Sequence, residues 1–261
     1  MARDARWLRT GLWLAAGALA LAACEAAGDN RPIHPGGGGG NGSGSGRDAA
    51  VDAPTDDGGN GMLRGTVCIV ADLRQPGRCA ASGADGILVS EVGTSNTATT
   101  DTAGDFAMAV SGTGTTVLEA GRTTLTVVPS LVPVAVGGGR VEVPVVRDDA
   151  FNELVIALGP VIPNGTGTVA LTFETAARAP IAGVAVVAPA GAANQPFYDL
   201  PGGPTDWTTD GGTGAFGAAL LFGVPPPTAD VSASDSGGAD LSPGRLPVDD
   251  DHVTFATVIA P

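Results

Sequence analysis

The sequence predicts an all-β fold, with two tandem antiparallel sandwiches of the immunoglobulin-like type, and three observations favour it. Of the 261 residues, 41 are Gly and 20 are Pro, a composition typical of many short strands joined by turns. Short runs of β-branched residues recur between Gly, Pro, Asn and Asp, and no helical periodicity is sustained over a dozen residues. An internal repeat also divides the chain beyond residue 61 into two similar halves.

The expected strands follow from the β-branched runs, each bounded by turn residues. Examples are residues 66–70, 86–92, 115–118, 125–128, 141–146 and 154–158. Regular turn punctuation between them favours antiparallel pairing over a parallel sheet with crossover helices. We therefore expect strands and hairpins throughout this part of the chain.

The repeat consists of three pairs of matching segments. Gly-Thr-Val occurs at 65–67 and at 167–169, residues 84–89 are echoed by 181–186, and residues 99–106 by 208–216. In each copy a first strand opens the unit and a Gly turn leads into a core strand. A Thr-Thr-Asp segment then forms a tight hairpin, in which the Asp accepts backbone N–H bonds, a Gly supplies positive φ, and the next Phe enters the core.

These motifs resemble those of the carboxypeptidase-regulatory-like domains, which are prealbumin-like seven-stranded sandwiches. The second copy matches through Pro-Ile-Ala-Gly-Val-Ala-Val at 180–186 and through Thr209-Asp210 to Phe216, whereas the first copy has Ala-Asp-Gly-Ile at 84–87 and lacks the proline. The resemblance implies two non-catalytic modules, over 61–163 and 164–261, of a kind used in secreted proteins as spacers, adhesive units or glycan-binding units.

The N-terminus has the three parts of an export signal. Three arginines lie within the first ten residues, and an apolar run follows at 11–23, which is too short to span a bilayer. The run ends in Leu-Ala-Ala-Cys, which resembles the lipobox of bacterial lipoproteins. The resemblance implies a signal peptide over 1–23, lipid attachment at Cys24, and sorting to the outer membrane because Glu25 follows. The alternative is an ordinary cleavage site with a chance cysteine.

Residues 24–60 are rich in Gly, Ser and Asp and contain few apolar side chains, which predicts a disordered tether. The whole sequence carries a formal net charge of −14, so nucleic acid is excluded as a partner because phosphate binding requires a basic patch. The expected contact with the membrane is through the lipid anchor, with the protein facing either the periplasm or the cell surface. Lysine is absent, which excludes lysine-dependent catalysis.

Two cysteines remain beyond the tether, Cys68 and Cys79. The segment between them contains Gln-Pro-Gly at 75–77, a turn that can bring one thiol beside the other. Because an exported protein can keep a disulfide, we expect these residues to be paired. Unpaired thiols, or a reactive site, are the alternatives, although no further Cys or nearby His completes a zinc site.

Neither a catalytic residue nor a cofactor or metal site is expected. His252, which follows three aspartates at 249–251, is the only histidine beyond the tether, and no Gly-x-Ser-x-Gly motif supplies a nucleophile for it. The aspartates do not have the spacing of a calcium loop, so a solvated acidic turn is the expected role, with a calcium ion as the alternative.

Three aromatic residues, Phe197, Tyr198 and Trp207, lie in or next to a long insertion of the second copy. They have two possible roles: they fill a core that is short of aromatics, or they form an exposed face that stacks on sugar rings. The sequence as a whole therefore predicts a non-enzymatic, lipid-anchored surface protein that acts as a structural spacer or adhesive module. The alternative is a carbohydrate-binding surface protein, with or without Ca²⁺, whose partner is an envelope polysaccharide.

Overall fold

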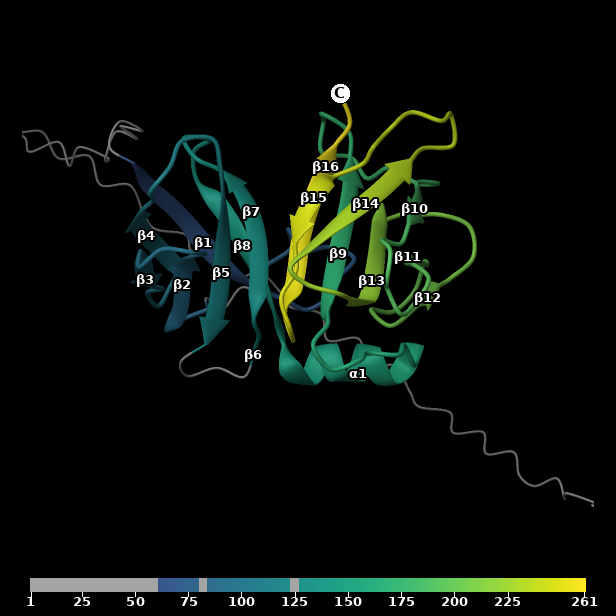
Figure 1. Ribbon diagram of the computed structural model, residues 1–261, viewed down its shortest axis with the longest axis horizontal. Helices are drawn as coiled ribbons and strands as arrows, with labels where there is room; N and C mark the ends of the chain where they lie inside the picture. Colours follow the sequence, from purple (N-terminus) through teal and green to yellow (C-terminus); the bar gives the residue numbers. More distant parts are fainter. Residues whose placement is uncertain (1–60, 80–83, 123–126) are drawn as a thin grey trace, which may run out of the picture. The chain divides into compact units, whose positions relative to one another are not determined.

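A computed structural model describes residues 61–79, 84–122 and 127–261 of the chain (Figure 1). Eight strands come first: β1 (Met62–Val70), β2 (Ile87–Glu91), β3 (Thr97–Thr99), β4 (Asp105–Ala109), β5 (Thr115–Arg122), β6 (Val127–Val128), β7 (Ser130–Ala135) and β8 (Val141–Arg147). After the helix α1 (Asp148–Leu158), eight more follow: β9 (Gly167–Glu174), β10 (Ala185–Val187), β11 (Phe197–Asp199), β12 (Trp207–Thr208), β13 (Ala218–Val224), β14 (Thr228–Ser234), β15 (Gly244–Pro247) and β16 (Val253–Ile259).

The predicted all-β class is confirmed, and the two sets of strands follow the same order. In the first sandwich, β4-β1-β8-β6 faces β7-β5-β2-β3 across one core. In the second, β13-β9-β16, extended by β11 and β12, faces β10-β14-β15 across another. Strand β1 thus corresponds to β9, β4 to β13 and β8 to β16. The expected limits of 61–163 and 164–261 for the two modules stay a prediction.

Antiparallel pairs predominate, but the first and last strands of each sandwich pair in parallel. Strand β8 runs parallel to β1, and β16 runs parallel to β9. Strands β1, β8 and β9 each have an antiparallel neighbour on the other side, whereas β16 pairs in parallel with β7 as well. The parallel pairing arises because the last strand of each sandwich returns to lie beside the first.

The repeated Gly-x-Val motif has a packing reason in β1. A Cβ at Gly65 would lie 2.5 Å from the ring of Phe106 and 2.6 Å from the carbonyl oxygen of Val141. Only glycine fits at so close an approach. As predicted, Phe106 is buried in the core and the Asp101 carboxylate accepts N–H bonds from Ala103 and Asp105 in the hairpin.

The hairpin alignment of the second copy was wrong by four residues. The Thr100 hydroxyl accepts the N–H of Ile87 and donates to the Ala84 carbonyl. In the second sandwich it is Thr213, not Thr209, that makes the same pair of bonds, to the N–H of Val184 and the carbonyl of Ile181. The insertion before β13 hides this equivalence in the sequence. Phe216 is correspondingly only half-buried and does not enter the core as Phe106 does.

The expected strand at 154–158 is also wrong, because these residues belong to α1. Two aspartates begin the helix, where negative charge is favourable, and Gly159 ends it in a left-handed conformation with φ of 61°. The apolar residues that pack on the core recur at helical spacing; they are Phe151, Leu154, Val155 and Leu158. Residues 154–158 form a short continuous apolar run, which periodicity alone does not assign to a helix or a strand.

The two sandwiches share one nine-stranded sheet, in the order β12-β11-β13-β9-β16-β7-β5-β2-β3. The junction is the parallel pair β7 and β16, which is limited to Val253 with Ser130 and Thr254 with Leu131. Beyond these residues the two strands diverge (Figure 1).

Strands β9 and β13 are buried on both faces. Their residues Val169, Leu171 and Leu221 point into the core of the second sandwich. The opposite face, which includes Leu220 and Phe222, belongs to the same apolar cluster as the core of the first sandwich. The Phe151 ring of α1 lies 6.2 Å from that of Phe222. The joint between the sandwiches is therefore a continuous hydrophobic core, which explains why β13 reads as an unbroken apolar run.

Candidate functional site

The signal peptide, the tether and the lipidation residue Cys24 all lie outside the described residues. In the part of the chain that the structure covers, no helix has the length and apolar character required to cross a membrane. The lipid anchor therefore stays a prediction.

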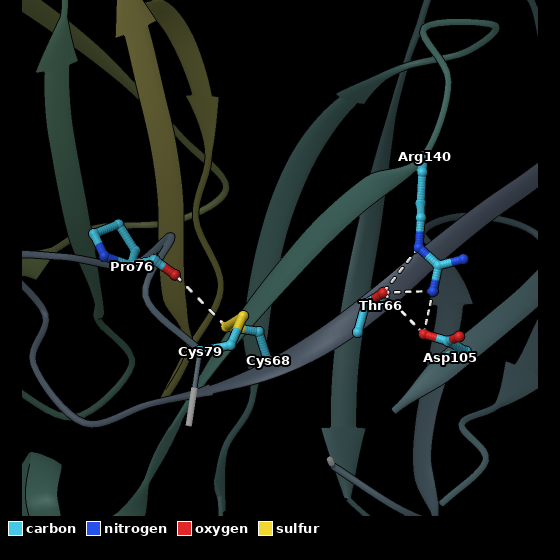
Figure 2. The surroundings of a disulfide bond; sticks show 6 residues. All are labelled: Thr66, Cys68, Pro76, Cys79, Asp105 and Arg140. Carbon is cyan, nitrogen blue, oxygen red and sulfur yellow. Dashed lines mark hydrogen bonds and ion pairs between the residues drawn. A yellow bond between two sulfur atoms is a disulfide. The ribbon is translucent and has the colours of Figure 1, made fainter. Parts of the chain in front are cut away.

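The expected disulfide is confirmed between Cys68 of β1 and Cys79, whose Cα atoms lie 4.9 Å apart (Figure 2). It closes the loop that follows β1, and Cys79 bridges back to Val70. Beside it, on β1, the Thr66 hydroxyl donates to the Asp105 carboxylate at 2.9 Å, and Arg140 forms an ion pair with the same carboxylate. This guanidinium holds the pKa of Asp105 below its ordinary value.

The three candidate aromatic residues are buried, so the exposed sugar-stacking face is not present. Phe197, Tyr198 and Trp207 are 9 %, 4 % and 8 % exposed, respectively. The Tyr198 hydroxyl bonds both the N–H and the carbonyl of Val186, and the Trp207 indole N–H donates to the Pro204 carbonyl at 2.9 Å. Each polar atom is thus satisfied inside the fold, as buried Tyr and Trp require. Of the two roles considered above, the structure favours core packing.

Among the residues that the structure describes, the hydrogen-bond partners of the His252 ring include no hydroxyl that could serve as a nucleophile. One ring nitrogen lies 2.6 Å from the Asp250 carbonyl oxygen and the other lies 3.5 Å from the Glu119 carboxylate. The three preceding aspartates form an exposed turn. Within the described ranges, no group of three His, Cys, Asp or Glu side chains is placed to hold a metal ion.

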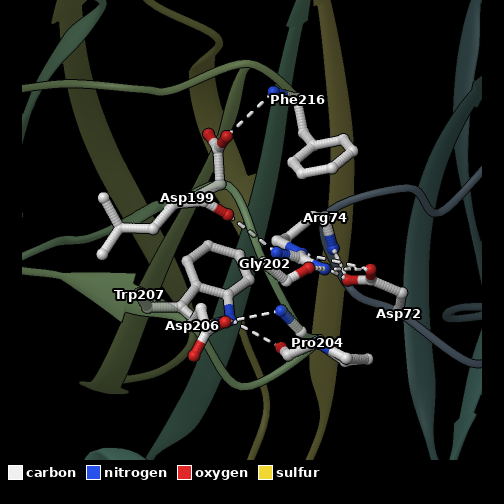
Figure 3. Close-up of polar contacts among 10 residues, drawn as sticks. Asp72, Arg74, Asp199, Gly202, Pro204, Asp206, Trp207 and Phe216 are labelled. Carbon is white, nitrogen blue, oxygen red and sulfur yellow. Dashed lines mark hydrogen bonds and ion pairs between the residues drawn. The ribbon is translucent and has the colours of Figure 1, made fainter.

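A buried arginine that the sequence did not single out links the two sandwiches. Arg74 lies in the disulfide-closed loop, with its side chain only 2 % exposed (Figure 3). Its guanidinium binds Asp72 with two nitrogens, at 2.9 and 2.6 Å, and donates to the carbonyls of Leu200 and Gly202 at 2.8 and 3.1 Å. It also lies 4.5 Å from the ring centre of Phe216.

Asp199 holds the segment before β13, which includes the Phe216 that Arg74 contacts. It is 1 % exposed, and its carboxylate accepts the backbone N–H groups of Gly214, Phe216 and Ala218, each at 2.8 Å. Figure 3 shows the bond from Phe216. A Cβ at Gly214 would lie 2.3 Å from the Asp199 carbonyl oxygen, so only glycine fits there. The contacts that Asp199 makes, and those of Arg74 with the second sandwich, have no local sequence signal, because these partners are backbone groups distant in the chain.

A second buried carboxylate, Glu91 at the end of β2, fixes the outer turns of the first sandwich. It accepts bonds from the Asn96 amide at 2.8 Å, from the Thr116 hydroxyl at 2.9 Å and from the Ser111 backbone N–H. These bonds, the one from Asn96 above all, lower the pKa of Glu91 to about 2.

Stability is therefore expected to fall in acid. Since the pKa of Glu91 is lower in the folded chain than the ordinary value of about 4.3, its contribution is complete above pH of about 4.3 and is lost as the pH falls toward about 2. We expect the urea midpoint to decrease over this window, and to decrease less in Glu91→Gln. Exposed Glu153 supplies the control: if Glu91→Gln and Glu153→Gln retain the same acid dependence as the parent, Glu91 does not contribute as stated.

A groove of about 860 Å³ lies where β7 and β16 diverge. Its walls include Val132 and Val134 of β7 and Phe255 and Thr257 of β16. Two exposed ion pairs, Arg140 with Asp105 and Arg178 with Glu174, border it. Strands of both sandwiches line it.

No known protein family matches the sequence, and no curated protein matches it either. The resemblance to carboxypeptidase-regulatory-like domains thus rests on the short motifs alone. It does not establish membership of that family.

Several solved structures share strand-rich domains with this chain. A type II cohesin–X-dockerin complex from Acetivibrio cellulolyticus has a chain 12% identical, with 40% of this chain and 75% of that chain covered, at a TM-score of 0.25. A shaft pilin of Lactobacillus rhamnosus GG is 9% identical, with 77% of this chain and 97% of that chain covered, at a TM-score of 0.23. A streptococcal ancillary pilin is 12% identical, with 79% of this chain and 64% of that chain covered, at a TM-score of 0.22. At these scores the likeness carries no argument about function.

Proposed function

We propose that the chain is a non-enzymatic, lipid-anchored protein of the bacterial outer membrane, whose two sandwiches serve as a structural spacer or adhesive module. The observation that carries the proposal is the joint. One sheet runs through both sandwiches, a shared apolar cluster fills the space between them, and Arg74 binds across it. Such a joint suits a unit that must hold two modules in a fixed relation.

The chemistry of the described side chains supports a role without catalysis. The buried polar side chains Arg74, Glu91 and Asp199 are all committed to structural bonds. His252 contacts a backbone carbonyl and a carboxylate, which gives it no nucleophile to activate. The partners that fit this role are the membrane, through the lipid, and other envelope proteins or polysaccharides.

The alternative of carbohydrate binding relied on an exposed aromatic face, and the three residues proposed for that face are buried. Because Phe197 and Trp207 are buried in the shared apolar cluster and Tyr198 in the core of the second sandwich, sugar stacking on them would require this packing to open. We therefore propose the spacer or adhesive role in preference to sugar binding at that loop.

The lipid anchor is tested by Cys24→Ser. A multiply acylated cysteine anchors stably, since each buried methylene contributes about 0.8 kcal/mol, so the loss of the thiol should release the protein from the membrane fraction. Fractionation followed by immunodetection measures this. Ala26→Ser, which keeps the thiol, should remain in the membrane fraction. Retention of Cys24→Ser at the parent level would show that the anchor is not at this residue.

A further inference from the structure

The exposed main-chain edge of β16 is a feature that the proposed role does not use. Strand β16 pairs with β9 along its whole length, from Val253 to Ile259, but with β7 only at its first two residues. The remaining edge of β16 borders the groove between the sandwiches.

The hydrogen bonds at the two ends of β16 determine which residues face the groove. Thr168 donates to the His252 carbonyl and Ala260 donates to the Glu174 carbonyl, so the even-numbered residues turn their backbone groups toward β9. Val253 donates to the Pro129 carbonyl, on the β7 side. Because the direction alternates along a parallel strand, odd-numbered residues face this side; the pairing of Thr254 with Leu131 uses the Phe255 N–H. The Phe255 carbonyl and the N–H and C=O of Thr257 and Ile259 therefore point into the groove.

Pro133 explains why the pairing of β7 with β16 stops. The next bond of the parallel ladder would run from the nitrogen of residue 133 to the Phe255 carbonyl, and proline has no N–H to donate. On β7, Val136 donates to the Gly114 carbonyl of the β5 side, so odd-numbered residues such as Ala135 face the groove as well. The groove is therefore bordered by main-chain edges of two parallel strands.

The edge of β16 lacks the features that protect other strand edges. From Phe255 to Ile259 it contains no proline and no charged residue, and every residue but one is a good strand former. The charged residues that line the groove are two of each sign: Arg140 and Arg178 with Glu142 and Glu174. The groove therefore exerts little attraction on a charged ligand, and it suits an uncharged strand.

We propose that this groove binds an extended, uncharged segment of a partner polypeptide, which adds to β16 as a strand. The added strand would continue the sheet from the place where the β7–β16 ladder ends, and its main chain would bond the Phe255 carbonyl and the N–H and C=O of Thr257 and Ile259. In strand addition the main-chain bonds supply the affinity, so recognition should tolerate many uncharged sequences. This inference does not depend on the lipid anchor and is tested separately from it.

The test uses the full chain and an octapeptide of alternating threonine and valine, acetylated and amidated so that it carries no charge. Amide hydrogen exchange is measured with and without about 1 mM peptide. We expect exchange at Thr257 and Ile259 to slow by at least about tenfold, and the same peptide N-methylated at alternate residues to give no protection. Unchanged exchange at both amides with the unmethylated peptide would overturn the proposal.

A matched pair of variants tests the edge itself. Thr257→Pro removes the N–H that faces the groove and leaves the bonds to β9 in place, whereas Thr257→Val keeps that N–H and loses only the hydroxyl contact with Thr172. We expect Thr257→Pro to bind the peptide at least about tenfold more weakly than Thr257→Val. Equal affinities would contradict binding at this edge. The N-methylated peptide gives the same test on the parent chain if the proline variant does not fold.

Discussion

Replacing Asp199 by alanine is expected to cost about 3 to 5 kcal/mol of the free energy of unfolding. The carboxylate is buried and accepts three backbone N–H groups, from Gly214, Phe216 and Ala218. Alanine would leave all three donors without this acceptor, the one of Ala218 in a fully buried place, and the segment before β13 would lose its anchor. Urea unfolding, followed by the fluorescence of Trp207, measures the change.

Two further variants distinguish the loss of acceptors from a general effect of substitution. Asp199→Asn keeps one side-chain carbonyl oxygen, which can accept the N–H groups of both Gly214 and Ala218. It should therefore cost less free energy of unfolding than the alanine change. Asp210→Ala alters an exposed aspartate near the same segment and should shift stability by no more than about 0.5 kcal/mol. If Asp199→Ala were as mild as Asp210→Ala, the anchoring role would be wrong.

The second large effect is expected from Arg74→Ala, at about 2 to 4 kcal/mol. Breaking a buried ion pair by removing one partner costs about 3 to 5 kcal/mol, and the value here is reduced because Asp72 is partly exposed. The change also leaves the carbonyls of Leu200 and Gly202 without their donor and removes the contact with Phe216. We expect the unfolding transition to move to lower urea concentration and to broaden, because the joint between the sandwiches is weakened.

Arg78→Ala is the matched control, since Arg78 lies in the same disulfide-closed loop and is exposed. It should leave the transition nearly unchanged. Arg74→Lys keeps the charge but cannot bind Asp72 and two carbonyls with a planar fork, so it should restore only part of the loss. Transitions for Arg74→Ala and Arg78→Ala that coincide would show that Arg74 does not hold the joint.

Local patterns in the sequence were sufficient for the strands, the turn chemistry and the disulfide. The strand-forming runs at 66–70, 86–92 and 141–146 lie in β1, β2 and β8, and Asp101 caps its hairpin as the motif predicts. The strand expected at 154–158 failed because a run of Leu, Val and Ile suits a helix as well as a strand. The hairpin of the second copy failed because an insertion changed the spacing on which the alignment relied.

The candidate site depended on contacts that no local pattern encodes. The sequence left Trp207 and its neighbours open between core and ligand face, and burial was decided by the packing of β11 and β12 beside β13. Arg74 and Asp199 bind backbone groups more than ten residues away, which any sequence could supply. The groove likewise exists because two strands far apart in the chain meet at one end only.

By itself the sequence predicted the all-β class, the repeated order of its motifs and the pairing of Cys68 with Cys79, and the absence of lysine excluded lysine chemistry. These follow from residue type and from short spacing, which act locally. The tertiary structure alone decided that the two sandwiches share a sheet and a core, and that Pro133 leaves the edge of β16 free. Both depend on which strands become neighbours, and that is set by the packing of the whole chain.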